Sequence, residues 1–282
     1  MLCETLDLSS VFPKLPRGEK TPTLTAYVHR GGSTVEDRKK FPAMLILPGG
    51  GYHVVSDREG EPIAMAYYAK GFNCFVLDYT VVPDGYYPTQ LVQAAASATI
   101  IRTNTEWNNT DYLAVCGFSA GGHLAASLGT RWMKCGISEV TGQPDRLARP
   151  DAMVLCYAAP TVNEGRVVQA AMRGLNGKDA PEESVNSQDL ACDVTEDTPP
   201  AFFWHTAEDE TVPIANPLRF AAKMQKAGVP TEVHIFPFGP HGMALADPIT
   251  SASSLPSDGY VARWVELSIR FLALMQERRE QK

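Results

Sequence analysis

The sequence predicts an α/β protein in which helices cover both faces of a mainly parallel central sheet. From about residue 42 to the end, short apolar runs alternate with longer stretches of helical periodicity, as they do in β-α units. Several apolar runs, such as 43–47 and 113–116, contain no charged position, which is typical of strands buried on both faces. A chain of 282 residues accommodates such a sheet in one domain, and we therefore assign 1–282 to a single domain.

The individual elements follow from the same patterns. Strands are predicted at 24–28, 43–47, 73–77, 112–116, 152–156, 201–205 and 231–236. Helices are predicted at about 60–70, 88–105, 120–130, 214–227 and 259–277. The first twenty residues are expected to form an arm laid on the surface.

Two segments, 131–150 and about 175–200, fit neither period and are rich in Pro, Gly, Asp and Glu. Long excursions inside a compact domain often serve as lids or substrate walls, and we expect these two to lie near the site. A disordered surface insertion is the alternative interpretation.

Composition narrows the function classes. The formal net charge of −7 argues against nucleic acid and anionic membrane as partners, because both bind cationic faces. The first ten residues show neither a basic leader nor an apolar signal stretch, and no apolar run is long enough to span a bilayer, so a cytoplasmic protein is expected. The six cysteines include no C-x-x-C pair, and three lie in predicted strands, which favours buried free thiols: Cys74, Cys116 and Cys156.

A candidate nucleophile follows the fourth predicted strand. The segment Gly117-Phe118-Ser119-Ala120-Gly121 lies between that strand and a helix, where a G-x-S-x-G elbow places its serine on a sharp turn. Glycines two positions on either side let the chain fold back, and the amide of Ala120 at the helix start can donate to an oxyanion. The alternative interpretation is a glycine-rich turn in which the serine is incidental.

A second glycine-rich turn follows the second predicted strand. Pro48-Gly49-Gly50-Gly51 lies where an elbow of this kind takes its other amide donors. We therefore predict an oxyanion hole from the amides of Gly50, Gly51 and Ala120. The alternatives are a flexible turn and a phosphate-binding loop, and the second lacks the Gly-Lys-Ser/Thr that such a loop requires.

Six histidines compete for the role of general base. His241 lies between the last predicted strand and the last helix, on a loop that can bring it over the sheet edge to Ser119. His123 lies along the helix after the elbow and is predicted to be a packing residue. Three more fall within strands and are predicted to be structural: His29, His205 and His234.

Asp209, on the loop after the strand at 201–205, is the candidate acid that orients the base. The order Ser119, Asp209, His241 is that of α/β-hydrolases and differs from the orders in chymotrypsin and subtilisin, so the α/β-hydrolase fold is predicted. Glu208 and Glu210 are predicted to be solvated neighbours, and Asp247 is the alternative acid. Residues beside the motifs are the predicted substrate contacts: Tyr52, His53 and Phe118.

The motifs together resemble the carbohydrate esterases of the α/β-hydrolase superfamily, close to acetylxylan esterases and bifunctional acetylxylan/feruloyl esterases, and more distantly the hormone-sensitive-lipase group. The resemblance covers most of 42–275, and its matching segments are LPGGGY at 47–52, REGEPIA at 58–64, GFSAGGHLAA at 117–126, 204–213 and 241–242. The lipase group has histidine where this chain has Pro48, which argues against a lipase.

The resemblance implies removal of acetyl groups from xylan-derived or related oligosaccharides, and the residues imply an acyl-enzyme route without metal or cofactor. The cysteines in the strands are not paired with histidines at zinc spacing. A feruloyl or other small-ester hydrolase, an amidase or a peptidase would use the same triad. A binding protein on a hydrolase scaffold is the alternative from another class. The sequence does not predict the oligomeric state.

Overall fold

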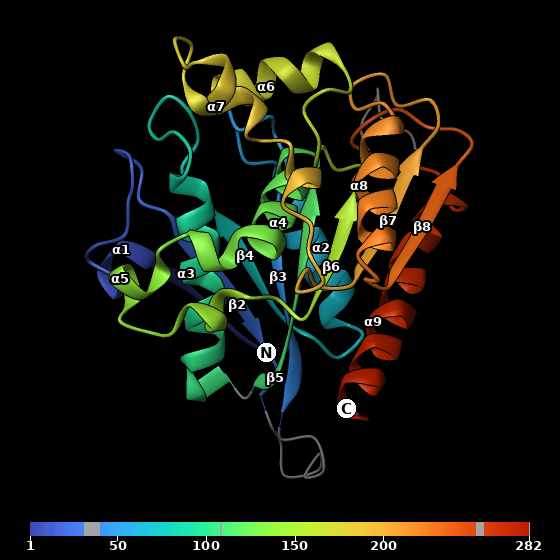
Figure 1. Cartoon of the computed structure of the whole chain (residues 1–282). Coiled ribbons are helices and arrows are strands. Elements are labelled where there is room, and N and C mark those ends of the chain that lie inside the picture. Colours follow the sequence, from blue (N-terminus) through green and yellow to red (C-terminus); the bar gives the residue numbers. More distant parts are fainter. Residues whose placement is uncertain (31–39, 108, 252–256, 282) are drawn as a thin grey trace.

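An eight-stranded sheet runs through the molecule (Figure 1). The computed structural model describes residues 1–30, 40–107, 109–251 and 257–281. The strand order is β1-β2-β4-β3-β5-β6-β7-β8, and the strands are β1 Leu2–Asp7, β2 Thr23–Val28, β3 Phe41–Leu47, β4 Asn73–Asp78, β5 Asn109–Phe118, β6 Ala152–Cys156, β7 Ala201–Thr206 and β8 Thr231–Phe236. The pairs from β4–β3 to β7–β8 are parallel, whereas β1–β2 and β2–β4 are antiparallel. The predicted mainly parallel sheet is confirmed.

Helices pack on both faces of this sheet. They are α1 Leu8–Val11, α2 Glu61–Tyr68, α3 Thr89–Thr103, α4 Ala120–Arg131, α5 Ile137–Thr141, α6 Arg166–Asn176, α7 Glu182–Asn186, α8 Ala215–Lys226 and α9 Trp264–Glu280. Side chains of α3, α4 and α8 share one buried cluster, and those of α2 and α9 share another. Alternate residues of one strand join the two clusters: Leu45 and Leu47 of β3 face the first, and Met44 and Ile46 face the second. The wholly apolar strands of the sequence are explained by this two-sided burial.

The prediction that the first twenty residues form an arm laid on the surface was wrong. Residues 2–7 form the edge strand β1, and α1 directly after it has Leu8 fully buried in the first cluster. None of the residues of β1 is fully buried, so the sequence of this edge strand shows no apolar period that would predict it.

The segment 131–150 lies away from the carboxyl ends of the strands and packs as short helical turns against α3. Ile137 and Ala148 are fully buried there in the first cluster. The prediction that this segment forms a lid or substrate wall was therefore wrong, and its apolar residues serve the core.

The cap over the carboxyl ends of the strands consists of α6 and α7 (Figure 1). Asn216 at the start of α8 holds the segment that leads into the cap. Its side-chain NH₂ group donates to the carbonyls of Thr161 and Glu164, and its side-chain oxygen accepts from the amide of Thr161. An ion pair between Arg173 of α6 and Glu182 of α7 joins the two helices. The cap is thus a defined structure tied to the sheet layer below it.

Among the described residues, no helix combines the length and the apolar character needed to cross a membrane. The cytoplasmic location stays a prediction. Cys74, Cys116 and Cys156 are buried, unpaired thiols in β4, β5 and β6, as predicted.

Candidate active site

Ser119 alone connects β5 to α4, and its backbone is strained. Its φ of 51° and ψ of −116° lie in a region that residues with side chains rarely adopt. A Cβ on Gly117 would lie 2.2 Å from the carbonyl oxygen of Gly121, and a Cβ on Gly121 would lie 2.1 Å from that of Leu47. Both glycines are therefore required by close backbone contacts, which is the geometry of the predicted elbow.

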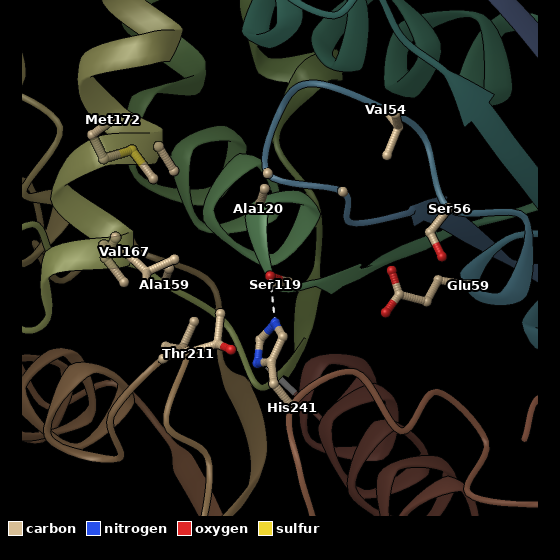
Figure 2. Close-up of a pocket in the computed structure, with 15 residues that line it drawn as sticks. Val54, Ser56, Glu59, Ser119, Ala120, Ala159, Val167, Met172, Thr211 and His241 are labelled. Atoms are coloured by element: carbon tan, nitrogen blue, oxygen red, sulfur yellow. Dashed lines mark hydrogen bonds between the residues drawn. The ribbon is translucent and has the colours of Figure 1, made fainter. Parts of the chain in front are cut away.

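A hydrogen-bonded relay joins Ser119, His241 and Asp209 at the carboxyl ends of the strands. The Ser119 Oγ lies 2.8 Å from Nε2 of His241, the bond drawn in Figure 2. The Nδ1 of the same ring lies 2.6 Å from Oδ2 of Asp209. A hydroxyl that donates to Nε2 requires the proton of the neutral ring on Nδ1, which then donates to the carboxylate. This arrangement can take a proton from Ser119 and stabilise the resulting imidazolium.

Both oxygens of Asp209 are held by donors. Oδ1 accepts from the amides of Thr211 and Val212 at 2.9 and 2.8 Å, while Oδ2 accepts from His241 and has Nε2 of His205 at 3.2 Å. Burial alone favours the neutral carboxyl, but the bonds from His205 and His241 outweigh burial and hold the pKa of Asp209 below its ordinary value of 3.8. Asp209 is thus a charged acid with a fixed orientation.

His205 is a contact of the relay that sequence reasoning missed. Its Nε2 lies 2.7 Å from the carbonyl oxygen of Val212, and because a carbonyl only accepts, this nitrogen is the protonated one. The same N–H faces Asp209. The prediction of a buried structural histidine in β7 is confirmed, since the side chain is fully buried, but the ring also faces the candidate acid. The spacing His205 to Asp209 across the end of β7 was the available signal.

The glycine loop after β3 lies beside the same relay. Gly50 and Gly51 line the cavity beside Ser119, together with Ala120, the first residue of α4. The loop closes through bonds from the amides of His53 and Val54 to the carbonyl of Gly50. Within the part of the chain that the structure describes, no hydrogen bond occupies the amides of Gly50 and Gly51. These two amides and that of Ala120 remain available for an oxyanion.

The two glycines of this loop should differ sharply in their tolerance of alanine. A Cβ on Gly50, whose φ is 125°, would lie 2.1 Å from the carbonyl oxygen of Val54, whereas a Cβ on Gly51 would come no closer than 3.9 Å to any side chain. We expect Gly50→Ala to lower kcat for an ester by about 10²–10³-fold. The clash would displace the loop, and the effect would equal the loss of an oxyanion donor. Gly51→Ala, the matched control, should stay within about tenfold, because its cost is that of one left-handed alanine. Equal losses in the two variants would show that loop geometry does not govern the rate.

The cavity at Ser119 has a volume of about 390 Å³ and two unlike sides. Ser56 and Glu59 lie on one side of the relay in Figure 2, and an apolar wall lies on the other. Four residues of that wall come from α6: Val167, Val168, Ala171 and Met172. No helix or strand was predicted at 166–174, so this wall was missed, although the strong apolar periodicity of Arg166–Asn176 was its signal. The predicted wall at 175–200 contains α7, which lies beside α6 (Figure 1) and is joined to it by the Arg173–Glu182 ion pair, but none of its residues lines this cavity.

A family comparison adds to this geometry. The model of the family described as BD-FAE matches residues 33–224, more than half of the chain. The chain belongs to the BD-FAE family. This membership, with the solved structures below, confirms the resemblance to esterases of the α/β-hydrolase superfamily and the α/β-hydrolase fold.

Three similar proteins place this BD-FAE chain among known ones. It is 35% identical over 236 residues to endo-1,4-β-xylanase B of Butyrivibrio fibrisolvens, an alignment that covers 80% of this chain but only 35% of that protein's length. The carboxylesterase Cest-2923 from Lactobacillus plantarum WCFS1 has a TM-score of 0.81 at 30% identity, over 99% of this chain and 98% of that one. The acetyl ester-xyloside bifunctional hydrolase from Caldicellulosiruptor lactoaceticus has a TM-score of 0.78 at 31% identity, over 92% and 89%.

Two of the substrate contacts predicted for the BD-FAE chain, Tyr52 and Phe118, were wrong because both side chains are buried in the core. Tyr52 is only 1% exposed, and Phe118 is fully buried against Tyr157 and Trp264 in the second cluster. Neither side chain lines the cavity, because the pleat and the tight turn direct both into the core. His53 is exposed and lies near Gly174 of α6, outside the cavity lining.

Tyr52 instead packs against a second buried histidine. Its hydroxyl lies 2.7 Å from Nδ1 of His123, whose Nε2 lies 3.2 Å from the carbonyl oxygen of Gln188. Because that carbonyl only accepts, Nε2 is protonated and the Tyr52 hydroxyl donates to Nδ1. The predicted packing role of His123 is confirmed, and the ring connects the glycine loop to the cap.

His123 should make the BD-FAE fold sensitive to acid. Burial, and then the nearby Arg131 charge, lower the pKa of His123 from 6.5 to about 3. The unfolded chain therefore binds this proton first, and stability falls as the pH drops below the ordinary pKa. We expect the wild type to lose on the order of 1–2 kcal/mol more than His123→Gln between pH 6.5 and about 4.5. Urea unfolding at both pH values measures this difference, and parallel losses would contradict it.

Proposed function

We propose that this BD-FAE family member, a carboxylic-ester hydrolase of the α/β-hydrolase type, removes acetyl groups from xylan-derived or related oligosaccharides through an acyl-enzyme. One observation supports the serine route above all others. A hydrogen-bonded relay of Ser119, His241 and Asp209 lies beside a cavity that Gly50, Gly51 and Ala120 line, and no described residue accepts a hydrogen bond from the amides of the two glycines.

The reaction begins with attack of the Ser119 Oγ on the ester carbonyl while Nε2 of His241 takes the hydroxyl proton. The carbonyl oxygen becomes an oxyanion that accepts from the loop and helix amides. When the intermediate collapses, the C–O bond to the sugar breaks and His241 returns the proton to the leaving hydroxyl. Water then attacks the acyl-enzyme, again losing its proton to His241, and acetate and free Ser119 are released.

Two features support an acetylated sugar as the substrate. A solved relative is named for an acetyl ester and a xyloside, and a curated relative is named as a xylanase. The cavity also has a polar side, where the hydroxyl of Ser56 can bind a sugar hydroxyl group beside the scissile ester.

The apolar α6 wall favours a second candidate, a feruloyl or other larger acyl ester. Val168 and Met172 are buried, and with Val167 and Ala171 they offer an apolar surface that an acetyl group alone would not cover. An aromatic acyl group would gain more from that surface than acetate would.

A panel of matched substrates separates these candidates. We would compare kcat/KM for an O-acetylated xylooligosaccharide, its feruloylated counterpart and an N-acetylated sugar. The proposal predicts the highest value for the O-acetyl ester and the lowest for the amide. A feruloyl value at least tenfold above the acetyl value would favour the second candidate instead.

Reaction with a fluorophosphonate probe tests the serine itself. The folded protein should be labelled at Ser119, and a variant without that hydroxyl should not. Absence of labelling and of acetate release in folded protein would favour a non-catalytic binding protein on the same scaffold.

A further inference from the structure

The turn 57–59 lies beside two loops of the candidate active site. Its third residue, Glu59, is 4% exposed and lines the cavity beside Ser119 (Figure 2). The Oε2 atom of Glu59 accepts from the amide of Gly49 at 2.8 Å. Gly49 directly precedes Gly50 and Gly51, which line the cavity, so this bond fixes the start of the proposed oxyanion loop.

The other carboxylate oxygen reaches the loop of the base. The hydroxyl of Tyr157 donates to Oε1 of Glu59 at 2.6 Å and accepts from the amide of Ala244 at 3.0 Å. Burial, and then the charge of Glu59, raise the pKa of Tyr157 well above its ordinary value, so the phenol keeps the proton that it donates. The Tyr157 ring also packs edge-on against the ring of His241, 5.0 Å between centroids. One carboxylate thus joins the oxyanion loop to the segment that follows the base.

The neighbouring arginine strengthens the same connection. Arg58 donates from Nη2 to the carbonyl of Gly242 at 3.0 Å and from Nε to that of Thr250 at 2.6 Å. Gly242 is the residue after His241. Two adjacent side chains of one turn therefore hold the loops on both sides of the nucleophile.

We propose that Glu59 is a positioning residue that keeps the oxyanion amides and the general base in register on opposite sides of Ser119. This inference rests on the proposed function, because register matters only if the loop and the base act on one reacting carbonyl. It also gives a role to Arg58 and Glu59, the first two residues of the segment 58–64, which neither the triad nor the oxyanion hole explains.

The chemistry of the two donors explains why a carboxylate suits this position. The amide of Gly49 and the hydroxyl of Tyr157 both donate, and the Tyr157 oxygen is already an acceptor for Ala244. A carboxylate accepts at both oxygens, whereas a glutamine of the same shape accepts at one and presents an NH₂ group at the other. Glu59→Gln therefore breaks one of the two connections while filling the same volume.

The test compares Glu59→Gln with wild type on two esters, 4-nitrophenyl acetate and an acetylated xylooligosaccharide. We expect kcat to fall by about 10- to 100-fold on both, because small misplacement of catalytic groups costs this much. KM should stay within about threefold, and fluorophosphonate labelling should slow by the same factor as kcat. Asp57→Asn, at the exposed first position of the turn, is the matched control and should behave as wild type.

Three results would overturn the inference. The first is an unchanged kcat in Glu59→Gln, and the second is a rise in KM without a fall in kcat. The third is a fall in kcat on the sugar ester alone, which would make Glu59 a substrate contact. A melting temperature for each variant shows whether the fold is intact. If Glu59→Gln does not fold, Tyr157→Phe decides, because it removes the hydroxyl that links Glu59 to Ala244 and should lower kcat on both esters.

The double variant of Glu59 and Tyr157 completes the test. Its loss should be well below the product of the single losses, since both changes break one connection, and multiplicative losses would contradict a shared role. Ser119→Ala, assayed in parallel, separates the two proposals. If that variant stays active the serine mechanism fails, whereas an inactive Ser119→Ala beside a fully active Glu59→Gln refutes only the positioning role.

Discussion

Replacing Ser119 by alanine should lower kcat for ester hydrolysis by about 10⁶-fold, the loss that removal of the nucleophile causes in subtilisin. The physical reason is that the acyl-enzyme forms on the Oγ atom of Ser119. This oxygen lies 2.8 Å from Nε2 of His241, and Ser119 is the single residue that connects β5 to α4. The oxyanion amides and the cavity remain in the variant, so substrate should still bind. Release of acetate measured over hours, beside the rate without enzyme, gives the size of the loss.

A matched control for that variant is Ser56→Ala. Ser56 lines the same cavity, and its hydroxyl has no part in the relay. Its loss should remain within about tenfold, which is the scale of one hydrogen bond. Activity in Ser119→Ala above a few per cent of wild type would show that another group or water performs the attack.

Asp209→Asn should lower kcat by about 10⁴-fold, as the corresponding change does in a serine protease. An asparagine amide can turn its NH₂ group toward Nδ1 of His241, and that ring would then protonate Nε2, the nitrogen that must accept from Ser119. The carboxylate also stabilises the imidazolium that forms during the reaction, and a neutral amide would not.

The structure makes this prediction sharper than the motif alone. Oδ1 of Asp209 accepts two backbone amides and Oδ2 faces two histidines, so asparagine loses an acceptor wherever its NH₂ group points. Glu210→Gln is the control, because Glu210 is the exposed neighbouring carboxylate and should be dispensable. A rate for Asp209→Asn within tenfold of wild type would remove Asp209 from the relay and direct attention to Asp247.

The fold was largely predictable because its strands are buried on both faces. Runs such as 43–47 and 152–156 are apolar throughout, and the structure places both in the centre of the sheet. The edge strand β1 was not predictable in the same way. This strand pairs with β2 at the edge of the sheet, and most of its side chains are exposed. Polar and apolar residues are therefore both tolerated along it, and no strand period appears in its sequence.

The relay was predictable for a topological reason, and the cavity lining was not. Parallel strands bring their carboxyl ends to one edge, so a serine after β5, an acid after β7 and a histidine after β8 come to the same edge of the sheet. Which side chains face the cavity depends on turn geometry that residue type does not reveal. Tyr52 and Phe118 adjoin the motifs in sequence, yet they point into the core, while α6 forms the wall from a segment without any motif.

The position of α6 separates two tasks along the chain. The residues of the candidate relay follow the ends of the strands, whereas the apolar wall belongs to an excursion between β6 and β7 that is bonded to the layer below by Asn216. Mutations at the cavity-facing positions of α6 can therefore alter which ester fits without changing the relay of Ser119, His241 and Asp209. The range of esters that fit can therefore change through α6 while the candidate relay stays the same.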